Sequence, residues 1–156
     1  MRKNNYVKYL NARIIHCDGG AFVEPPNYIF HDAYFSVVDD NGTLIHFAEN
    51  IGDLWSGVAE YEAIKWVTLN IKERPLVITS DCTTAIAWAK NGSSKKSKFR
   101  IHCVDLRGIE LVYRHGNLAD QWNAENHSPK KDKSFYIKRY YKSLGSKAMK
   151  PPSSAI

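Results

Sequence analysis

Four acidic residues carry the clearest chemical signal in this sequence. Asp18 directly follows the apolar run ARIIHC, and Asp81 directly follows the apolar run LVITS. Glu60 and Asp120 lie near the starts of two segments whose apolar residues have helical spacing. Carboxylates brought together repel one another, so a cluster of them requires a cation, and hard oxygen ligands favour Mg²⁺. Two such ions about 3.5–4 Å apart can activate water for phosphodiester cleavage.

Each acid also has an ordinary structural interpretation. Taken singly, Asp18 suits a turn, and Glu60 suits a solvated helix face. Asp81 and Asp120 suit helix starts, where the helix dipole stabilises acids. Glu62 is a second candidate near Glu60, but two helical residues turn its side chain roughly 200° away. The four acids in this order, in a chain with a basic tail, favour a metal site over four unrelated roles.

Three strands are expected to begin the element order that positions these acids. Residues 12–17 form a short apolar run that we expect to end at the turn Asp18-Gly19-Gly20. Residues 33–38 and 43–50 are β-rich runs on either side of Asp39-Asp40-Asn41-Gly42. An Asn-Gly turn between such runs predicts a hairpin. The first three strands are therefore expected to form an antiparallel meander.

Helices and strands are expected to alternate in the second half of the chain. Helical spacing over 56–70, with Ser56 as the N-cap, precedes a five-residue apolar run typical of a buried parallel strand. The further predictions are a strand over 76–80, a helix over 82–92, a strand over 109–116 and a helix over 117–127, with no clear pattern over 93–108. This order predicts an α/β fold whose parallel half joins an antiparallel half. If the first and fourth strands are parallel neighbours, Asp18 and Asp81 emerge at the same edge of the sheet.

The net charge of +6 is concentrated at the C-terminal end of the chain. Residues 129–156 hold eight basic residues and one acid, so residues 1–128 are nearly neutral. We therefore predict a domain over 1–128 and a basic, aromatic extension over 129–156, partly helical with a frayed end. The extension keeps the protein soluble, docks on the domain or contacts nucleic acid, and docking with an electrostatic contribution is favoured. A second basic cluster contains Lys95, Lys96, Lys98 and Arg100.

Other features exclude whole classes of protein. No apolar run reaches the roughly 18 residues that a membrane span needs, and the N-terminus lacks the pattern of a secretory signal. Cys17, Cys82 and Cys103 are widely spaced and form no CxxC pair, which argues against a disulfide framework and a zinc site. Cys17, Cys82, Trp66 and Trp88 are expected to be core residues. We expect a soluble, monomeric protein of the cytoplasm, with no membrane partner.

Four segments resemble, in order, the four carboxylate blocks of type 1 ribonuclease H. They are IIHCDGGAF, SGVAEYEAIKWV, VITSDCTTAIAW and HGNLADQWNAEN, and together they span about residues 12–126. The AEYEA block is especially similar to the bacterial and plant branch of that family. The resemblance implies a mixed five-stranded sheet flanked by helices, with antiparallel strands 1–3 and parallel strands 4–5. It also implies that Asp18, Glu60, Asp81 and Asp120 are metal ligands.

The resemblance implies a metal-dependent endonuclease that hydrolyses the RNA strand of RNA–DNA hybrids. Two Mg²⁺ ions, or Mn²⁺, would be held, one by Asp18 and Asp120 with or without Asp81, the other by Asp18, Glu60 and Asp81. His115 resembles the family's mobile-loop histidine, which assists proton transfer or product release; a surface histidine in a turn is its alternative. The remaining histidines, His16 among them, lack metal-ligand spacing and receive no role. The expected contacts to nucleic acid are Gly19, Gly20, Ser56, Gly57, Cys82, Thr83, Lys95, Lys96 and Lys98.

The chain also departs from the family pattern. GAFVEPPNY replaces the short polar turn common after the first aspartate, and Ser56-Gly57 replaces paired asparagines. Only four residues separate His115 from Asp120, and a long basic handle helix is not evident, with KKSKFR as the one possible substitute. Two alternatives therefore stay open. One is a hybrid- or duplex-RNA-binding module that does not cleave, and the other is a nuclease of this fold with another nucleic acid substrate.

Overall fold

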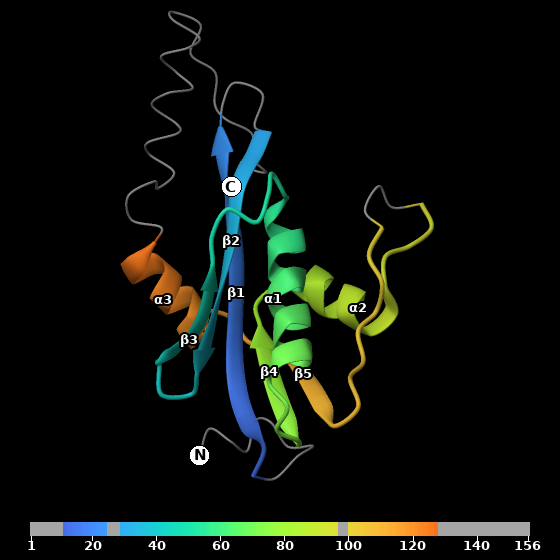
Figure 1. Ribbon diagram of the computed structural model, residues 1–156. Helices are drawn as coiled ribbons and strands as arrows, with labels where there is room; N and C mark the ends of the chain where they lie inside the picture. Colours follow the sequence, from blue (N-terminus) through green and yellow to red (C-terminus); the bar gives the residue numbers. More distant parts are fainter. Residues whose placement is uncertain (1–10, 25–28, 97–99, 128–156) are drawn as a thin grey trace, which may run out of the picture.

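The computed structural model describes residues 11–24, 29–96 and 100–127, which form five strands and three helices (Figure 1). Their order is β1 (Arg13–Glu24), β2 (Ile29–Asp39), β3 (Leu44–Ala48), α1 (Ser56–Asn70), β4 (Leu76–Ser80), α2 (Thr83–Asn91), β5 (Ile109–Tyr113) and α3 (Leu118–Asn126). The predicted extension over 129–156 and the predicted contact Lys98 lie outside the described residues. Within the described residues, no helix is both long and apolar enough to cross a membrane.

The strands form one mixed sheet in the order β3-β2-β1-β4-β5. β1 pairs antiparallel with β2, and β2 pairs antiparallel with β3, so the predicted meander is confirmed. β4 lies parallel to both β1 and β5. The predicted mixed five-stranded sheet, with antiparallel strands 1–3 and parallel strands 4–5, is therefore confirmed by the strand order and directions.

β1 does not end at Asp18, and the turn predicted at Asp18-Gly19-Gly20 is wrong. The strand continues to Glu24, with Asp18 opposite Ser36 of β2 and an irregularity in register between Gly20 and Phe22. The two glycines provide room for close neighbours instead of a reversal of the chain. A Cβ atom on Gly19 would lie 2.6 Å from the backbone of Ala59, which real Cβ atoms essentially never do. Gly19 is therefore the point at which the backbone of α1 rests directly on β1.

The register of β1 on β4 still places Asp18 beside Asp81. The last pair of this parallel ladder joins His16 to Thr79, and each aspartate lies two residues beyond its member of that pair. Successive side chains alternate between the faces of a strand, so equal offsets from one pair give equivalent positions. Asp18 thus lies in the middle of its own strand yet just past the end of its parallel pairing, where β4 stops at Ser80.

The hairpin between β2 and β3 forms where the Asn-Gly signal predicts it. The Asp39 carboxylate accepts hydrogen bonds from the backbone N–H groups of Asn41 and Thr43, at 2.8 and 3.0 Å. Gly42 has a φ of +86°, a value that favours glycine. The flanking strands differ in length from the prediction, because β2 begins at Ile29 and β3 ends at Ala48.

α1 covers the predicted range 56–70, but its N-cap is Trp55 rather than Ser56. Trp55 is extended, and its carbonyl accepts hydrogen bonds from the N–H groups of Val58 and Ala59. Its indole lies over Gly57, where a Cβ atom would meet the ring at 2.6 Å, and packs edge-on against Trp88. Packing of this large ring, not a side-chain hydrogen bond, therefore sets the start of the helix.

The main core lies between the sheet and α1. Ile15, Cys17 and Ile78 of the sheet are fully buried with Ile64 and Val67 of α1. Trp66, Trp88 and Cys82 pack against this core, and Cys17 lies within it, so these four predictions are confirmed. α3 packs on β1 and β2 and lies on the opposite face of the sheet from α1 (Figure 1).

The segments around α2 and β5 largely follow the sequence. α2 and α3 each begin one residue after their N-caps, Cys82 and Asn117, and α2 is closed by Gly92 with a φ of +76°. β5 ends at Tyr113, three residues earlier than predicted. The described residues between α2 and β5, 92–96 and 100–108, contain no helix.

We predict that Gly19→Ala lowers the free energy of unfolding by about 2–3 kcal/mol, because its methyl group would collide with the backbone of α1. Gly20→Ala is the matched control. Its methyl group would meet the end of the Tyr34 side chain, which can shift at lower cost. Urea unfolding followed by tryptophan fluorescence measures both variants. An effect of Gly19→Ala no larger than that of Gly20→Ala would contradict the close approach of α1.

Candidate metal centre

Three of the four predicted acids come together in one cluster. Asp18, Glu60 and Asp81 each offer a carboxylate oxygen, and these three oxygens all lie within 4.8 Å of one another. Asp18 and Glu60 are buried, while Asp81 is partly exposed. The cluster joins β1, α1 and the end of β4, so three elements distant in sequence form one site.

α1 brings Glu60 to the sheet through the close approach at Gly19. The Gly19 N–H donates a hydrogen bond to Glu60 Oε1 at 3.1 Å. Ala59 is fully buried beside it, and neither Gly19 nor Ala59 has a side chain large enough to separate helix and strand. The Gly19 N–H is thus engaged by Glu60. The predicted contact of Gly19 with nucleic acid stays a prediction.

Asp81 is held between β4 and α2. The Cys82 N–H donates to Ser80 Oγ at 3.2 Å, and Cys82 Sγ accepts from the Ala85 N–H at 3.4 Å. Cys82 thus caps α2 in addition to packing against the core. Thr83, the first residue of α2, is exposed two residues after Asp81. Residues 81–83 thus hold a partly exposed acid, an exposed hydroxyl and the N-terminus of a helix.

α3 brings Asp120 beside the cluster, although its carboxylate is not among the three that converge. Asp120 lies in the first turn of α3, as predicted, and its N–H donates to the capping Asn117 Oδ1 at 3.0 Å. Asp120 is close enough to Asp81 to feel its charge, and exposed His115 is close enough to act on Asp120. The structure therefore gathers three acids tightly and places Asp120 and His115 at their side.

Two buried asparagines of the α3 segment were not predicted as functional residues. Asn117 donates from Nδ2 to the carbonyl of Cys17 at 3.0 Å and to Thr79 Oγ1 at 3.0 Å, so the cap of α3 is tied to both β1 and β4. Asn123 donates from Nδ2 to Asp18 Oδ2 at 2.8 Å. An asparagine directly before a helix is an N-cap signal that could have identified Asn117. Asn123 lies three residues after Asp120, on the same helix face.

Burial and mutual repulsion shape the electrostatics of the cluster. Burial, followed by the charges of Asp81 and Asp120, raises the pKa of Asp18 well above its usual range, while the hydrogen bond from Asn123 acts in the opposite direction. Burial, followed by the charges of Asp18 and Asp81, likewise raises the pKa of Glu60. Burial and then Asp81 raise the pKa of Asp120, and His115 lowers it.

The donor set fits a hard divalent cation. None of the ion pairs formed among the described residues includes Asp18, Glu60 or Asp81. Like charges at this spacing are costly unless protons or a cation neutralise them. Carboxylate oxygens are the ligands that Mg²⁺ and Mn²⁺ prefer in proteins.

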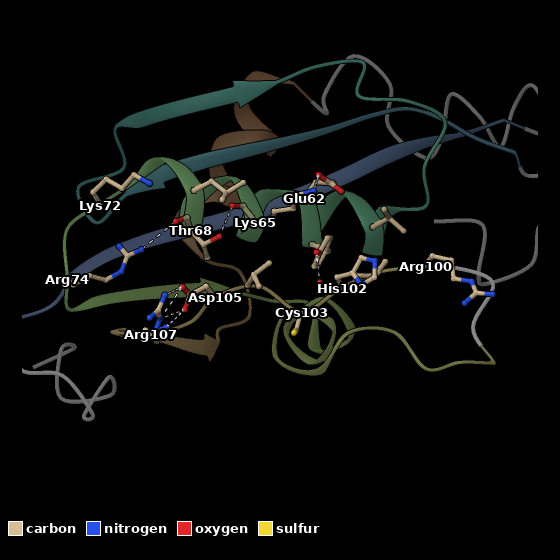
Figure 2. A pocket seen from close by; sticks show the side chains of 15 residues that line it. Glu62, Lys65, Thr68, Lys72, Arg74, Arg100, His102, Cys103, Asp105 and Arg107 are labelled. Atoms are coloured by element: carbon tan, nitrogen blue, oxygen red, sulfur yellow. Dashed lines mark hydrogen bonds and ion pairs between the residues drawn. The ribbon is translucent and has the colours of Figure 1, made fainter.

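A separate groove lies between α1 and residues 100–107, away from the cluster (Figure 2). None of the four acids lines it, whereas Glu62 does, so Glu62 is directed away from Glu60 as predicted. Two of the basic residues that line it are paired: Arg107 binds Asp105 at 2.6 Å, and Lys65 lies 4.0 Å from Glu62 (Figure 2). Lys72, Arg74 and Arg100 also line it, but no carboxylate of the cluster does. We therefore do not include this groove in the site.

The predicted contacts to nucleic acid are spread over the surface around the cluster. Gly19, Cys82 and Thr83 are neighbours in sequence of the clustered acids, and Gly20 follows in β1. Ser56 and buried Gly57 form the first residues of α1. Exposed Lys95 and Lys96 lie in a turn beyond the far end of α2. Their roles as contacts stay predictions.

Comparison with known proteins gives structural similarity at low sequence identity. No family model matches the sequence, and no curated protein matches it. LC11 ribonuclease H1 in complex with an RNA/DNA hybrid is 18% identical, with a TM-score of 0.46 over 70% of this chain and 89% of that chain. The foamy viral protease-reverse transcriptase in complex with double-stranded DNA is 20% identical, with a TM-score of 0.47 over 75% and 95%. The ribonuclease H domain of prototype foamy virus is 14% identical, with a TM-score of 0.43 over 83% and 92%. Similarity at this level does not identify the reaction.

The raised pKa values predict that, without metal, the stability of the fold depends on pH. A bound divalent cation is expected to offset the loss of stability at high pH. The pKa values of Asp18 and Glu60 are higher in the folded than in the unfolded chain, so raising the pH above about 4 favours unfolding until the folded pKa values are passed. Without metal, Asp18→Asn should therefore be more stable than wild type by about 1–2 kcal/mol at pH 8, with a smaller difference at pH 4.5. Mn²⁺ should stabilise wild type at pH 8 but not at pH 4.5.

Urea unfolding in a chelator and in Mn²⁺ measures these differences. Asp53→Asn, at an exposed position, is the control. Its free energy of unfolding should equal that of wild type at both pH values, and Mn²⁺ should stabilise it as it stabilises wild type. An advantage of Asp18→Asn over wild type that is the same at both pH values would contradict the account of the buried acids.

Proposed function

We propose that this protein is a metal-dependent endonuclease that hydrolyses the RNA strand of RNA–DNA hybrids. The observation that carries the proposal is the convergence of Asp18, Glu60 and Asp81, with oxygens within 4.8 Å, where the parallel pairing of β1 and β4 ends. Asp120 and His115 stand beside this cluster. These are the residues of the carboxylate blocks that resemble type 1 ribonuclease H, here brought together by the fold.

In the proposed mechanism, Asp18, Glu60 and Asp81 hold one Mg²⁺ or Mn²⁺ ion. Asp18 and Asp120, with or without Asp81, hold a second. When bound, the metal would supply an activated water and would stabilise charge on the phosphate oxygens. The chain's own side chains do the rest. The four acids fix where the phosphate is held, and exposed His115, next to Asp120, delivers a proton to the departing 3′ oxygen.

The start of α2 is suited to positioning the phosphate. Exposed Thr83 offers a hydroxyl two residues after Asp81, and the first N–H groups of a helix attract anions. Lys95 and Lys96 are exposed beyond the other end of α2, and their positive charge is proposed to attract the backbone of the bound duplex. Ser56 and Gly57, at the start of α1, are proposed to contact the same duplex.

The preference for a hybrid rests on the resemblance of the four blocks. A hybrid has an A-like minor groove that displays the 2′-hydroxyl groups by which RNA differs from DNA. One structural feature favours testing other substrates as well. β1 continues as a strand through Gly19 and Gly20, so the short turn common in the family after its first aspartate is replaced by sheet. We further propose that the protein acts as a monomer in the cytoplasm, where Cys17, Cys82 and Cys103 stay free thiols.

The test is cleavage of an end-labelled RNA strand offered in a hybrid, in duplex RNA and alone, with Mg²⁺ and then Mn²⁺. Wild type should cut the hybrid at internal positions. Asp18→Asn should lower the rate by about 10³-fold or more, because metal ligation contributes several kcal/mol to catalysis. Glu62→Gln, an acid on the same helix as Glu60 but outside the cluster, should stay within about twofold of wild type.

Three results would redirect the proposal. Retained cleavage in Asp18→Asn would refute the metal assignment. Hybrid binding without cleavage by wild type would support the non-cleaving module instead. Cleavage of duplex RNA or single strands in preference to the hybrid would keep the nuclease and change its substrate.

A further inference from the structure

Asn123 makes the direct hydrogen bond between α3 and an acid of the cluster. Its Nδ2 atom donates to Asp18 Oδ2 at 2.8 Å and lies 3.4 Å from the Asp18 carbonyl oxygen. Both side chains are buried, with exposed fractions of 2% for Asn123 and 7% for Asp18. Asn123 is one helical turn beyond Asp120, so one face of α3 presents an acid and an amide to the same carboxylate.

The orientation of the Asn123 amide is fixed by this contact. Its Oδ1 atom is buried and has no hydrogen-bond partner among the described residues. The opposite orientation would bring Oδ1 against Asp18 Oδ2, two acceptors at hydrogen-bonding distance. The fold thus engages the donor Nδ2 but leaves the buried acceptor Oδ1 without a hydrogen bond. Protein interiors avoid such unsatisfied acceptors because each one lowers stability. This pattern indicates that the donor is what the position requires.

We propose that Asn123 is a positioning residue for the metal centre, acting through Asp18. By engaging Oδ2 it fixes the rotation of the carboxylate and hence the place of both oxygens relative to Glu60 and Asp81. The cation then meets a ligand that is already oriented. This inference rests on the proposed function, because it requires that the cluster bind a divalent cation.

A neutral amide suits this position better than a cationic side chain. Lysine or arginine would satisfy Asp18 more strongly, but its charge would neutralise the cluster and compete with the metal. The amide donates a hydrogen bond without adding net charge. The attraction of the three carboxylates for a divalent cation is therefore preserved, while the carboxylate nearest α3 is held in place.

The experiment measures Mn²⁺ affinity and stoichiometry by isothermal titration calorimetry on the full chain at pH 7.5. Asn123→Ala removes the donor and leaves space, whereas Asn123→Leu removes the donor while keeping a similar volume, so the two variants together separate the loss of the donor from the loss of packing. Asn126→Ala, an exposed asparagine of the same helix, is the control. Thermal unfolding in a chelator reports the purely structural effect of each change.

We expect both Asn123 variants to bind Mn²⁺ about tenfold more weakly, which corresponds to about 1.4 kcal/mol. The number of ions per chain should be unchanged, and Asn126→Ala should stay within about twofold of wild type. Affinity equal to that of wild type, even with a lower Tm in chelator, would show that Asn123 is only structural and overturn the inference. Tighter binding or an additional ion would also overturn it, because the amide would then compete with the metal for Asp18.

Failure of this inference and failure of the proposed function give different results. Wild type that binds no divalent cation would refute the metal centre itself, and the inference with it. Wild type that binds Mn²⁺ with an affinity unchanged in the Asn123 variants would refute the inference alone.

Discussion

The repulsion among Asp18, Glu60 and Asp81 is the constraint on which the rest of the structure depends. Three carboxylates with oxygens within 4.8 Å of one another, two of them buried, stay together only if the surrounding fold holds them there. The register of β1 on β4 aligns the two aspartates, and the absence of a side chain at Gly19 lets α1 bring in the glutamate. Both the strand register and the close approach at Gly19 are features of the backbone, and the backbone shifts less readily than a side chain does. The cluster is thus an arrangement that a cation completes.

On the face of the sheet opposite α1, hydrogen bonds between buried polar side chains add to the apolar packing that joins α3 to the strands. Asn117 links the start of α3 to β1 and β4, and it donates to Thr79 Oγ1. That oxygen lies 2.6 Å from Nδ1 of buried His16, whose Nε2 lies 2.8 Å from Asp40 in the β2–β3 hairpin. His16, which lacks metal-ligand spacing, therefore has a structural role. The chain of hydrogen bonds runs from the hairpin to the start of the helix that carries Asp120.

Much of this fold could be predicted from local patterns, and the exceptions have tertiary causes. LVITS predicts a buried strand because all five of its residues are apolar or small. In the structure, all five are buried in β4. The extension of β1 through Gly19-Gly20 could not be predicted, because two glycines after an aspartate have the composition of a turn, and only the approach of α1 explains them. Trp55 replaces Ser56 as N-cap because its ring packs on Gly57 and Trp88. Three of the acids could be assigned to one place from their positions after strands and in helices, but the asparagine that holds Asp18 depends on contacts across more than a hundred residues.

The most direct test of the account is an anomalous-diffraction map from crystals of the full chain equilibrated with Mn²⁺. The account predicts a peak within coordinating distance of Asp18, Glu60 and Asp81, and its loss in Asp18→Asn crystals. A map with no peak at these acids, at Mn²⁺ concentrations that saturate binding in solution, would contradict it. In that case the buried carboxylates would be neutralised by protons, and the case for a metal-dependent nuclease would fall.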